Sequence, residues 1–444
     1  MSRQYFGTDG VRGRVGTDPM TADFAMRLAS AAAQVLVPSG GTVVIGKDTR
    51  LSGYMFESAL EAGFVAAGAD VLLLGPLPTP GIAILTQQFD ADLGVVISAS
   101  HNPYVDNGIK FFDRTGSKLT DEIESAIEEQ LRNRAITLES QSLGMAKRIN
   151  TARTRYQDFC TDSMPDGMDL EGLKIVFDAA NGAGYKVGPR ALSALGAEVI
   201  PIGCSPNGKN INDGCGSMAP ELLRLTVPAV KAAAGVALDG DGDRLVMVDE
   251  NGILIDGDQL LYILATARQR QGTLQGPVVG TVMSNLGLEH ALKAQNIDFR
   301  RASVGDRYVL EALRENGGII GGETSGHMLV LDKTTTGDGL VCALQVFAVM
   351  KETGKPLSEL ASGMPRYPQT LLNVRTEQRL DPAGSEAIQD AVAVAEGELA
   401  ERGRVVLRAS GTEPVIRVMV EGEDEQQVVS VAERLAAVVA EAAS

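Results

Sequence analysis

One pattern recurs three times along this chain: an apolar strand rich in β-branched residues, a Gly/Asn/Asp turn, an Ala/Leu-rich helix and a second strand. Near-continuous apolar strands that alternate with helices indicate mixed, largely parallel sheets covered on both faces. The strand–helix–strand units are expected at 42–48, 53–67 and 70–74, at 174–178, 186–195 and 198–200, and at 277–281, 286–294 and 297–300. The pattern predicts three topologically similar, mixed-sheet α/β domains.

The last part of the chain has a different pattern. After Pro365 and Pro368, strands are expected at 369–375, 404–408 and 414–421, and helices at 385–402 and 424–442. This is typical of a smaller C-terminal α+β domain. A chain of 444 residues is long enough for four domains at roughly 100–200 residues each. We place them at residues 1–155, 156–253, 254–367 and 368–444.

Charge excludes some classes of partner. There are 40 Lys and Arg residues against 57 Asp and Glu residues, a net charge of −17. Phosphate backbones and anionic membranes need a basic surface, so we expect neither nucleic acid nor a membrane as partner. An anionic ligand would require a local concentration of Arg and Lys. The sequence leaves a homo-oligomer open.

Cysteine usage and the first residues indicate the compartment. The four cysteines are too few and too scattered for a disulfide framework or a zinc site of the cysteine type. The N-terminal residues contain no apolar signal region, and no apolar run approaches the ~20 residues of a membrane span. We therefore expect a soluble, cytoplasmic protein.

The strongest motif is the acidic loop after the apolar residues 235–238. Asp239, Asp241 and Asp243 alternate with glycines, so the loop can curl until all three carboxylates converge. Such a like-charge cluster needs a cation, and oxygen-only ligands favour Mg²⁺ over Ca²⁺. An EF-hand is excluded because Arg244 stands where that loop requires glycine. The alternative is a solvated acidic turn.

A second loop places hydroxyls beside an imidazole and an amine. Ser98, Ser100, His101 and Asn102 follow the apolar residues 95–97, and Lys110 comes shortly after. A serine beside His and Lys at a strand end is typical of covalent group transfer. A plain Asx/Ser turn is the other interpretation.

Three more polar loops are rich in glycine. Residues 321–327 offer Glu, Ser and His suited to sugar hydroxyls, and residues 408–414 with Arg417 form a potential anion nest. Residues 7–13 form the third. Each could be an ordinary turn, but five such loops over four domains indicate one cleft that holds phosphate at more than one place.

These loops together resemble those of the α-D-phosphohexomutase superfamily, in order and over the whole chain. The matching segments are YFGTDGVRG (5–13), SASHNPYVDNGIKFF (98–112), DGDGDR (239–244), GGETSGH (321–327) and RASGTEPVIRV (408–418). FGTDG and NGIKFF look like the branch of the superfamily that acts on glucosamine phosphates. The resemblance implies three similar α/β domains and a smaller C-terminal domain around a central cleft.

The resemblance also implies an activity and its residues. The reaction is the interconversion of glucosamine 6-phosphate and glucosamine 1-phosphate, for cell-wall precursors, through a bisphosphate intermediate. The implied cofactors are Mg²⁺ and a hexose 1,6-bisphosphate that primes the serine. Ser100 would carry the phosphoryl group, and its phosphate would join Asp239, Asp241 and Asp243 as metal ligands. The implied substrate contacts are Glu323, Ser325, Arg408, Ser410, Gly411, Thr412 and Arg417.

Other catalytic roles stay open at this point. Arg12, Lys110 and Arg244 would spread developing negative charge, and His101, Lys110 and His327 are candidates for general acid or base. A lysine needs a lowered pKa to act as base. The rival functions are a phosphoglucomutase or phosphomannomutase, a metal-dependent sugar-phosphate phosphatase and a non-catalytic sugar-phosphate sensor.

Overall fold

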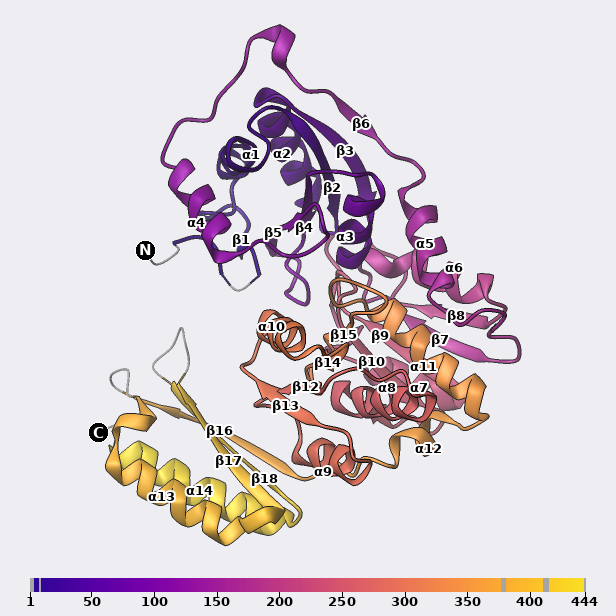
Figure 1. Cartoon of the computed structure of the whole chain (residues 1–444), viewed down its shortest axis with the longest axis vertical. Helices are drawn as coiled ribbons and strands as arrows, with labels where there is room; N and C mark the ends of the chain where they lie inside the picture. Colours follow the sequence, from indigo (N-terminus) through magenta and orange to yellow (C-terminus); the bar gives the residue numbers. More distant parts are fainter. Residues whose placement is uncertain (1–3, 8, 377–380, 410–414, 443–444) are drawn as a thin grey trace.

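The computed structural model describes residues 4–7, 9–376, 381–409 and 415–442. They form three α/β units and a C-terminal unit, which follow one another along the chain (Figure 1). No described helix is both long and apolar enough to cross a membrane.

The first unit contains a six-stranded sheet in the order β1-β5-β4-β2-β3-β6. Its strands are β1 (Val11–Arg14), β2 (Gly41–Lys47), β3 (Ala69–Pro76), β4 (Leu93–Ile97), β5 (Asp106–Asp113) and β6 (Ala146–Arg148). Its helices are α1 (Ala22–Leu36), α2 (Gly53–Ala66), α3 (Thr79–Gln88) and α4 (Asp121–Gln130). Every residue of β4 is buried, as expected for a strand covered on both faces.

The second unit has a five-stranded sheet, β11-β10-β9-β7-β8, and the third a four-stranded sheet, β13-β12-β14-β15. The second consists of α5 (Ala152–Asp162), β7 (Lys174–Asp178), α6 (Val187–Ala194), β8 (Glu198–Ile202), α7 (Glu221–Ala229), β9 (Ala234–Leu238), β10 (Leu245–Asp249) and β11 (Leu254–Ile255). The third consists of α8 (Gly257–Gln271), β12 (Val278–Thr281), α9 (Leu286–Ala294), β13 (Phe299–Ala302), α10 (Asp306–Asn316), β14 (Ile320–Gly322), β15 (Met328–Val330), α11 (Gly339–Thr353) and α12 (Leu357–Ala361).

The C-terminal unit has three antiparallel strands in the order β16-β18-β17, and two helices pack against them. Its elements are β16 (Gln369–Arg375), α13 (Glu386–Leu399), β17 (Gly403–Ala409), β18 (Val415–Gly422) and α14 (Glu425–Ala442). The helix expected to reach residue 402 ends at Leu399 because Ala400 takes a φ of +50°. Likewise the strand expected at 297–300 begins at Phe299, after Asn296 has turned the chain with a φ of +58°.

The predicted threefold relationship extends to strand order. Each α/β unit contains four successive strands of which the first pairs in parallel with the second and the third, and the third pairs antiparallel with the fourth. These quartets are β2–β5, β7–β10 and β12–β15. The loop from third to fourth strand is therefore the serine loop in the first unit, the acidic loop in the second and the 323–327 loop in the third. One topological position, repeated three times, supplies three of the chemistry-bearing loops.

One hydrophobic core spans all three α/β units, which also have separate clusters of their own, whereas the core of the C-terminal unit is not part of it. The shared core runs from Val44 in the first unit through Phe177 in the second to Phe347 in the third. A separate cluster between Ile388 and Val439 fills the C-terminal unit. A buried polar contact also joins α5 to the third unit: Tyr156 Oη donates to Asp338 Oδ2 at 2.9 Å.

Tyr156→Phe should show how much this contact contributes and how it depends on pH. Burial raises the pKa of Asp338 from 3.8 to about 6, so the folded state disfavours its ionised form as pH rises through that range. Removing the hydroxyl donor destabilises the ionised Asp338 carboxylate in the folded state. We expect a loss of about 1–3 kcal/mol in the free energy of unfolding near pH 8 and a smaller loss near pH 5.

Urea unfolding of both proteins at the two pH values measures this difference. Tyr185→Phe, a tyrosine outside the Asp338 contact, is the control and should change little. Equal losses from Tyr156→Phe at both pH values would contradict the assigned role of Asp338.

Candidate active site

The loop between β4 and β5 holds Ser100 in a buried, strained turn. Ser100 is 1% exposed and has a φ of +51°, which costs a non-glycine residue about 1–3 kcal/mol. Its backbone N–H donates to Ser98 Oγ at 2.9 Å, and Ser98 Oγ donates to Asp48 Oδ2 at 2.6 Å. Side chains from the end of two strands therefore hold the turn.

Arg50 binds the backbone of the same loop. This fully buried side chain also pairs with Asp48, at 2.8 Å. Its guanidinium donates to four loop carbonyls, those of Ser100 at 2.9 Å, Asn102 at 2.8 Å, Pro103 at 2.5 Å and Asp106 at 3.2 Å. From the second unit, Asn212 Nδ2 donates to Ser100 O at 2.9 Å. The planar, multi-donor guanidinium suits this contact, and an ammonium would not reproduce it.

The acidic loop between β9 and β10 lies directly against the serine loop. A Cβ on Gly240 would come within 2.6 Å of Ser100 O, so only glycine allows this approach. Asp239, Asp241 and Asp243 are buried, and one carboxylate oxygen from each lies within 4.8 Å of the others. Oδ1 of Asp241 and Oδ1 of Asp243 have no hydrogen-bond partner among the described residues. Converging, unpartnered carboxylate oxygens are the donor set that a hard divalent cation requires.

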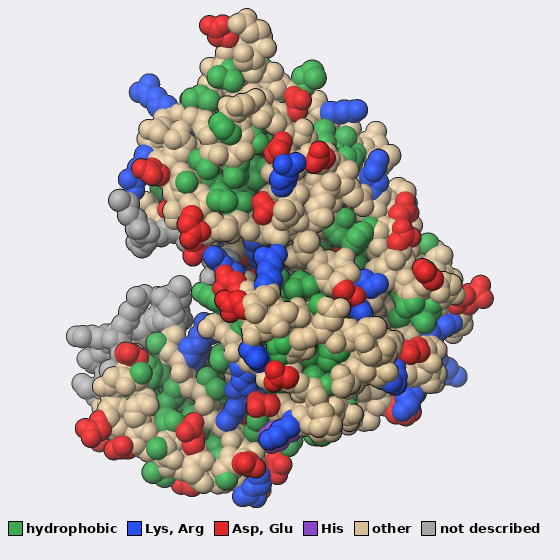
Figure 2. Space-filling model, in the orientation of Figure 1, with side chains coloured by type: hydrophobic (Ala, Val, Ile, Leu, Met, Phe, Trp, Pro, Cys, Tyr) green, Lys and Arg blue, Asp and Glu red, His purple; other side chains and the backbone are tan. Residues whose placement is uncertain are grey.

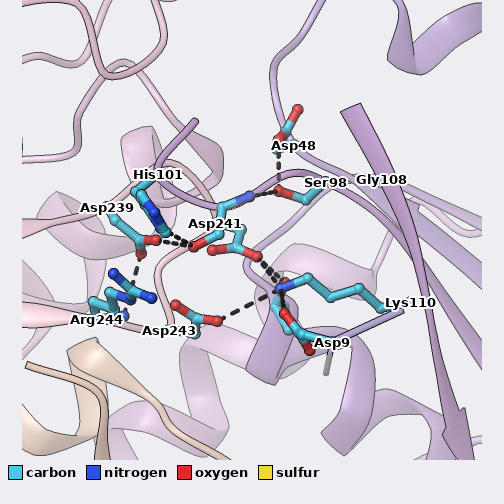
Figure 3. A network of polar contacts seen from close by, with 12 residues as sticks. Asp9, Asp48, Ser98, His101, Gly108, Lys110, Asp239, Asp241, Asp243 and Arg244 are labelled. Carbon is cyan, nitrogen blue, oxygen red and sulfur yellow. Dashed lines mark hydrogen bonds and ion pairs between the residues drawn. The ribbon is translucent and has the colours of Figure 1, made fainter. Parts of the chain in front are cut away.

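Lys110, on β5, brings positive charge to these carboxylates (Figure 3). Its Nζ lies 2.8 Å from Asp241 Oδ2, 3.0 Å from Asp9 Oδ2 and 3.6 Å from Asp243 Oδ2. Burial alone would lower the pKa of Lys110, but the three carboxylates outweigh it and raise that pKa above its usual range. Lys110 therefore keeps its proton at neutral pH.

Asp239 is repelled by neighbouring carboxylates, whereas Asp241 is paired with Lys110. Burial and the neighbouring carboxylates of Asp243 and Asp241 raise the pKa of Asp239 well above its usual range. It also contacts the serine loop, because Ser100 Oγ donates to Asp239 Oδ2 at 2.5 Å. The nucleophile candidate is thus bonded to a candidate metal ligand.

The two candidate histidines have opposite environments. His101 Nδ1 lies 3.4 Å from Ser100 Oγ, and burial together with the nearby Arg244 and Arg12 lowers the pKa of His101 to about 4. His327 is buried between Asp306, 3.3 Å from its Nε2, and Asp243, 3.8 Å from its Nδ1. Burial opposes protonation there, but the two carboxylates raise the pKa of His327. His101 is therefore a neutral, proton-accepting imidazole at pH 7, whereas the surroundings of His327 favour its protonated form.

Arg12 and Arg244 provide buried donors at the same place. Within the described part of the chain, Nε of each arginine has no hydrogen-bond partner. Arg12 also pairs with Asp9, and the backbone N–H of Arg244 donates to Asp239 Oδ1 at 3.2 Å. Two unpartnered guanidinium donors beside the serine loop suit an anionic group there.

The loop from β14 to β15 is tied to the acidic loop by the backbone. Arg244 and His327 form a β-bridge, and Leu245 N donates to Gly326 O at 2.9 Å. Glu323 is half-buried and accepts from Gly305 N at 3.0 Å, whereas Ser325 is exposed. The structure therefore brings residues 323–327 next to the acidic loop.

Two arginines lie side by side on the sheet of the C-terminal unit. Arg408 on β17 pairs directly with Arg417 on β18, and both side chains are exposed. Like charges directly opposite one another destabilise a sheet unless an anion lies between them. The predicted residues Ser410, Gly411 and Thr412 lie outside the described residues. Figure 2 shows Lys and Arg side chains along the seam between the C-terminal unit and the rest of the molecule.

Sequence reasoning missed several residues of the site. Asp48 and Arg50 position the serine loop, and Asp9 and Lys118 extend the ion pairs of Lys110, since Lys118 Nζ lies 2.6 Å from Asp9 Oδ1 and also pairs with Asp306. The one available signal was Asp48-Thr49-Arg50 directly after a buried strand, the position where α/β sheets carry function.

Comparison with known proteins gives matches over nearly the whole chain. The family descriptions that match are phosphoglucomutase/phosphomannomutase, alpha/beta/alpha domain I over residues 3–136, domain II over 155–252, domain III over 256–367 and the C-terminal domain over 371–438. A phosphoglucosamine mutase from Aeromonas hydrophila subsp. hydrophila is 58% identical over 437 residues, which cover 98% of each chain.

Solved structures share the fold. A phosphoglucomutase/phosphomannomutase family protein from Burkholderia thailandensis matches with a TM-score of 0.81 at 24% identity, over 98% of this chain and 97% of that chain. The N-acetylphosphoglucosamine mutase of Aspergillus fumigatus, solved in complex with GlcNAc-6P and magnesium, matches with a TM-score of 0.69 at 17% identity, over 100% and 96% of the two chains.

Asp239→Asn and Asp241→Asn should change the stability of the metal-free protein in opposite directions. Asp239 is repelled by its neighbours, so neutralising it should raise the melting temperature in EDTA. Asp241 pairs with buried Lys110, so its neutralisation should lower the melting temperature by about 2–8 °C. A divalent metal salt should raise the melting temperature of the wild type, and this rise should shrink in both variants.

Thermal unfolding in EDTA and in the metal salt measures both effects. Asp249→Asn, a buried aspartate outside the cluster, is the control for the response to metal. A wild-type melting temperature that does not respond to divalent metal would contradict the metal site.

Proposed function

Because this chain belongs to the phosphoglucomutase/phosphomannomutase family of the α-D-phosphohexomutase superfamily, we propose that it interconverts glucosamine 6-phosphate and glucosamine 1-phosphate by way of a phosphoryl group on Ser100. The enzyme is an isomerase that acts by phosphoryl transfer. The observation that carries the role of Ser100 is its hydroxyl, held against Asp239 inside the carboxylate cluster. The product serves cell-wall precursor synthesis.

Each half-reaction moves one phosphoryl group. A hydroxyl of the substrate attacks the phosphorus on Ser100, so that its new O–P bond forms as the bond from phosphorus to Ser100 Oγ breaks. The substrate hydroxyl loses a proton and Ser100 Oγ regains one. The resulting bisphosphate turns over in the cleft, and its other phosphoryl group passes back to Ser100. A hexose 1,6-bisphosphate can prime Ser100 by the same step.

Asp239, Asp241 and Asp243 are the proposed ligands of Mg²⁺, together with a phosphate oxygen on Ser100. The unpartnered carboxylate oxygens described above fit such an ion, and all-oxygen donors favour Mg²⁺. When bound, Mg²⁺ neutralises the charge that develops on the transferred phosphoryl group. Lys110, Arg12 and Arg244 add fixed positive charge on the remaining sides.

The pKa shifts of Lys110, His101 and His327 assign different roles to these three acid–base candidates. Lys110 holds its proton against three carboxylates, so we assign it to charge stabilisation rather than to proton abstraction. His101 is neutral at pH 7 and close to Ser100 Oγ, which suits a proton acceptor. The carboxylates of Asp306 and Asp243 raise the pKa of His327 and so favour its protonated form, which suits a proton donor.

The remaining substrate contacts follow from the other two loops. Glu323 and Ser325 would bind the sugar hydroxyls. The facing guanidinium groups would bind the phosphate that is not reacting, with help from the loop after β17: Arg408, Arg417, Ser410, Gly411 and Thr412. The proposal also includes the domain boundaries, at residues 1–155, 156–253, 254–367 and 368–444, and a cytoplasmic location. It includes no nucleic-acid partner, which the net charge of −17 supports.

Ser100→Ala should abolish isomerisation and leave the fold intact, because a single hydroxyl contributes little to the core. Intact-mass and peptide analysis should find one phosphoryl group per active wild-type chain, on Ser100, and none in the variant. Ser140→Ala, at an exposed serine far along the chain from this loop, is the control and should keep full activity. Full activity of Ser100→Ala would exclude Ser100 as the nucleophile. A coupled assay of the wild type on glucosamine, glucose and mannose phosphates identifies the substrate.

Arg50→Lys should lower kcat about 10- to 100-fold with little change in KM, because a displaced loop misplaces Ser100 while the substrate contacts stay. Arg155→Lys, on the outer part of α5, is the control for a charge-conserving change. If KM rises and kcat does not fall, Arg50 does not act through the position of Ser100.

A further inference from the structure

The C-terminal unit meets the third unit through a small polar cluster. Its hydrophobic core is separate, so packing between cores does not fix its orientation. Glu421, near the end of β18, is fully buried at this junction, where the two units lie side by side (Figure 1).

The Glu421 carboxylate is bound by donors from both units. On the third unit, Leu286 N donates to Oε1 at 3.1 Å and Asn285 Nδ2 donates to Oε2 at 3.2 Å. On its own sheet, Glu421 pairs with Arg404, whose Nη2 donates back to Ser284 O in the third unit at 2.7 Å. One buried carboxylate thus orders groups on both sides of the junction.

The cluster continues to the 323–327 loop. Asn285 N donates to Asp258 Oδ2 at 2.9 Å, and Thr324 Oγ1 donates to the same oxygen at 2.8 Å. Thr324 stands between Glu323 and Ser325, the proposed sugar contacts. Asp258, Asn285 and Glu421 are all buried and therefore poorly screened by solvent.

The same strand connects Glu421 to the phosphate-binding arginines. Glu421 and Arg417 are four residues apart on β18, hence on one face of the sheet and about 13 Å apart. The cross-strand register pairs Arg404 with Glu421 and Arg408 with Arg417, so the same face carries the junction and both arginines. The junction contact of Glu421 and the two arginines therefore lie on one face of the same strand pair.

We propose that Asp258, Asn285 and Glu421 are positioning residues that fix the phosphate-binding face of the C-terminal unit relative to the sugar-binding loop. This inference rests on the proposed function, because it concerns the distance between two parts of one bound phosphosugar. None of the three touches the substrate in this scheme. They act through Thr324 on one side and through Arg417 and Arg408 on the other.

The test is a double-mutant comparison of Glu421→Gln and Arg417→Ala. Glu421→Gln should raise KM for glucosamine 6-phosphate and glucosamine 1-phosphate alike, about 5- to 10-fold. If Glu421 acts by placing Arg417, Glu421→Gln should add less than about twofold to KM in the Arg417→Ala background. Glu425→Gln, an exposed glutamate at the start of α14, is the matched control and should leave KM unchanged.

Three results would overturn the proposal: an unchanged KM in Glu421→Gln, a KM effect that multiplies with that of Arg417→Ala, or an equal effect of Glu425→Gln. If Glu421→Gln does not fold, Asp258→Asn takes its place, since this near-isosteric change lies at the far end of the cluster and must give the same pattern. If the wild type lacks isomerase turnover, the proposed function fails by itself. In that case calorimetric titration of inorganic phosphate into the wild type and Glu421→Gln tests the positioning role separately. Equal phosphate affinities of the two proteins would overturn that role.

Discussion

Three buried carboxylates within a few ångströms of one another repel strongly, and the positive charge that balances them determines how the units of this protein are assembled. Asp239, Asp241 and Asp243 all come from the second unit, whereas Lys110 comes from the first. The first unit adds Asp9 and Lys118, and Lys118 reaches Asp306 of the third. Charges of alternating sign therefore cross the boundaries of all three α/β units at the proposed active site.

The repeated topology explains why these charges can meet. Each α/β unit carries a loop between the third and fourth strands of its repeated set of four, and the units pack with those three loops together. The glycines make the contact close: Gly240 lies against the Ser100 backbone, where a Cβ would come within 2.6 Å of its carbonyl oxygen. A buried, left-handed serine, an acidic loop and a polar sugar loop thus share one site, although 225 residues separate Ser100 from Ser325.

The C-terminal unit depends on a different kind of contact. It has its own core and joins the rest through the buried Glu421 and its partners. Polar contacts of this kind are directional, so they can define an orientation without a large apolar interface. In the proposed reaction the substrate presents either of its phosphates to Ser100, and this requires a defined spacing between the two ends of the site.

The sequence by itself determined the local features: the strand–helix units, the smaller C-terminal domain and the chemistry of each loop. Periodicity, turn residues and loop composition depend on neighbours in the chain, so they can be read there. Helix and strand ends at Ala400 and Asn296 escaped prediction because they depend on left-handed residues other than glycine. Only the tertiary structure decided that Lys110 holds its proton, that His101 and His327 have opposite environments, that Arg50 binds the serine loop and that Glu421 lies buried between two units. Each of these properties depends on charges and carbonyl groups brought from distant segments into a buried place, where a pKa and a hydrogen bond are set by spatial neighbours rather than by the order of residues.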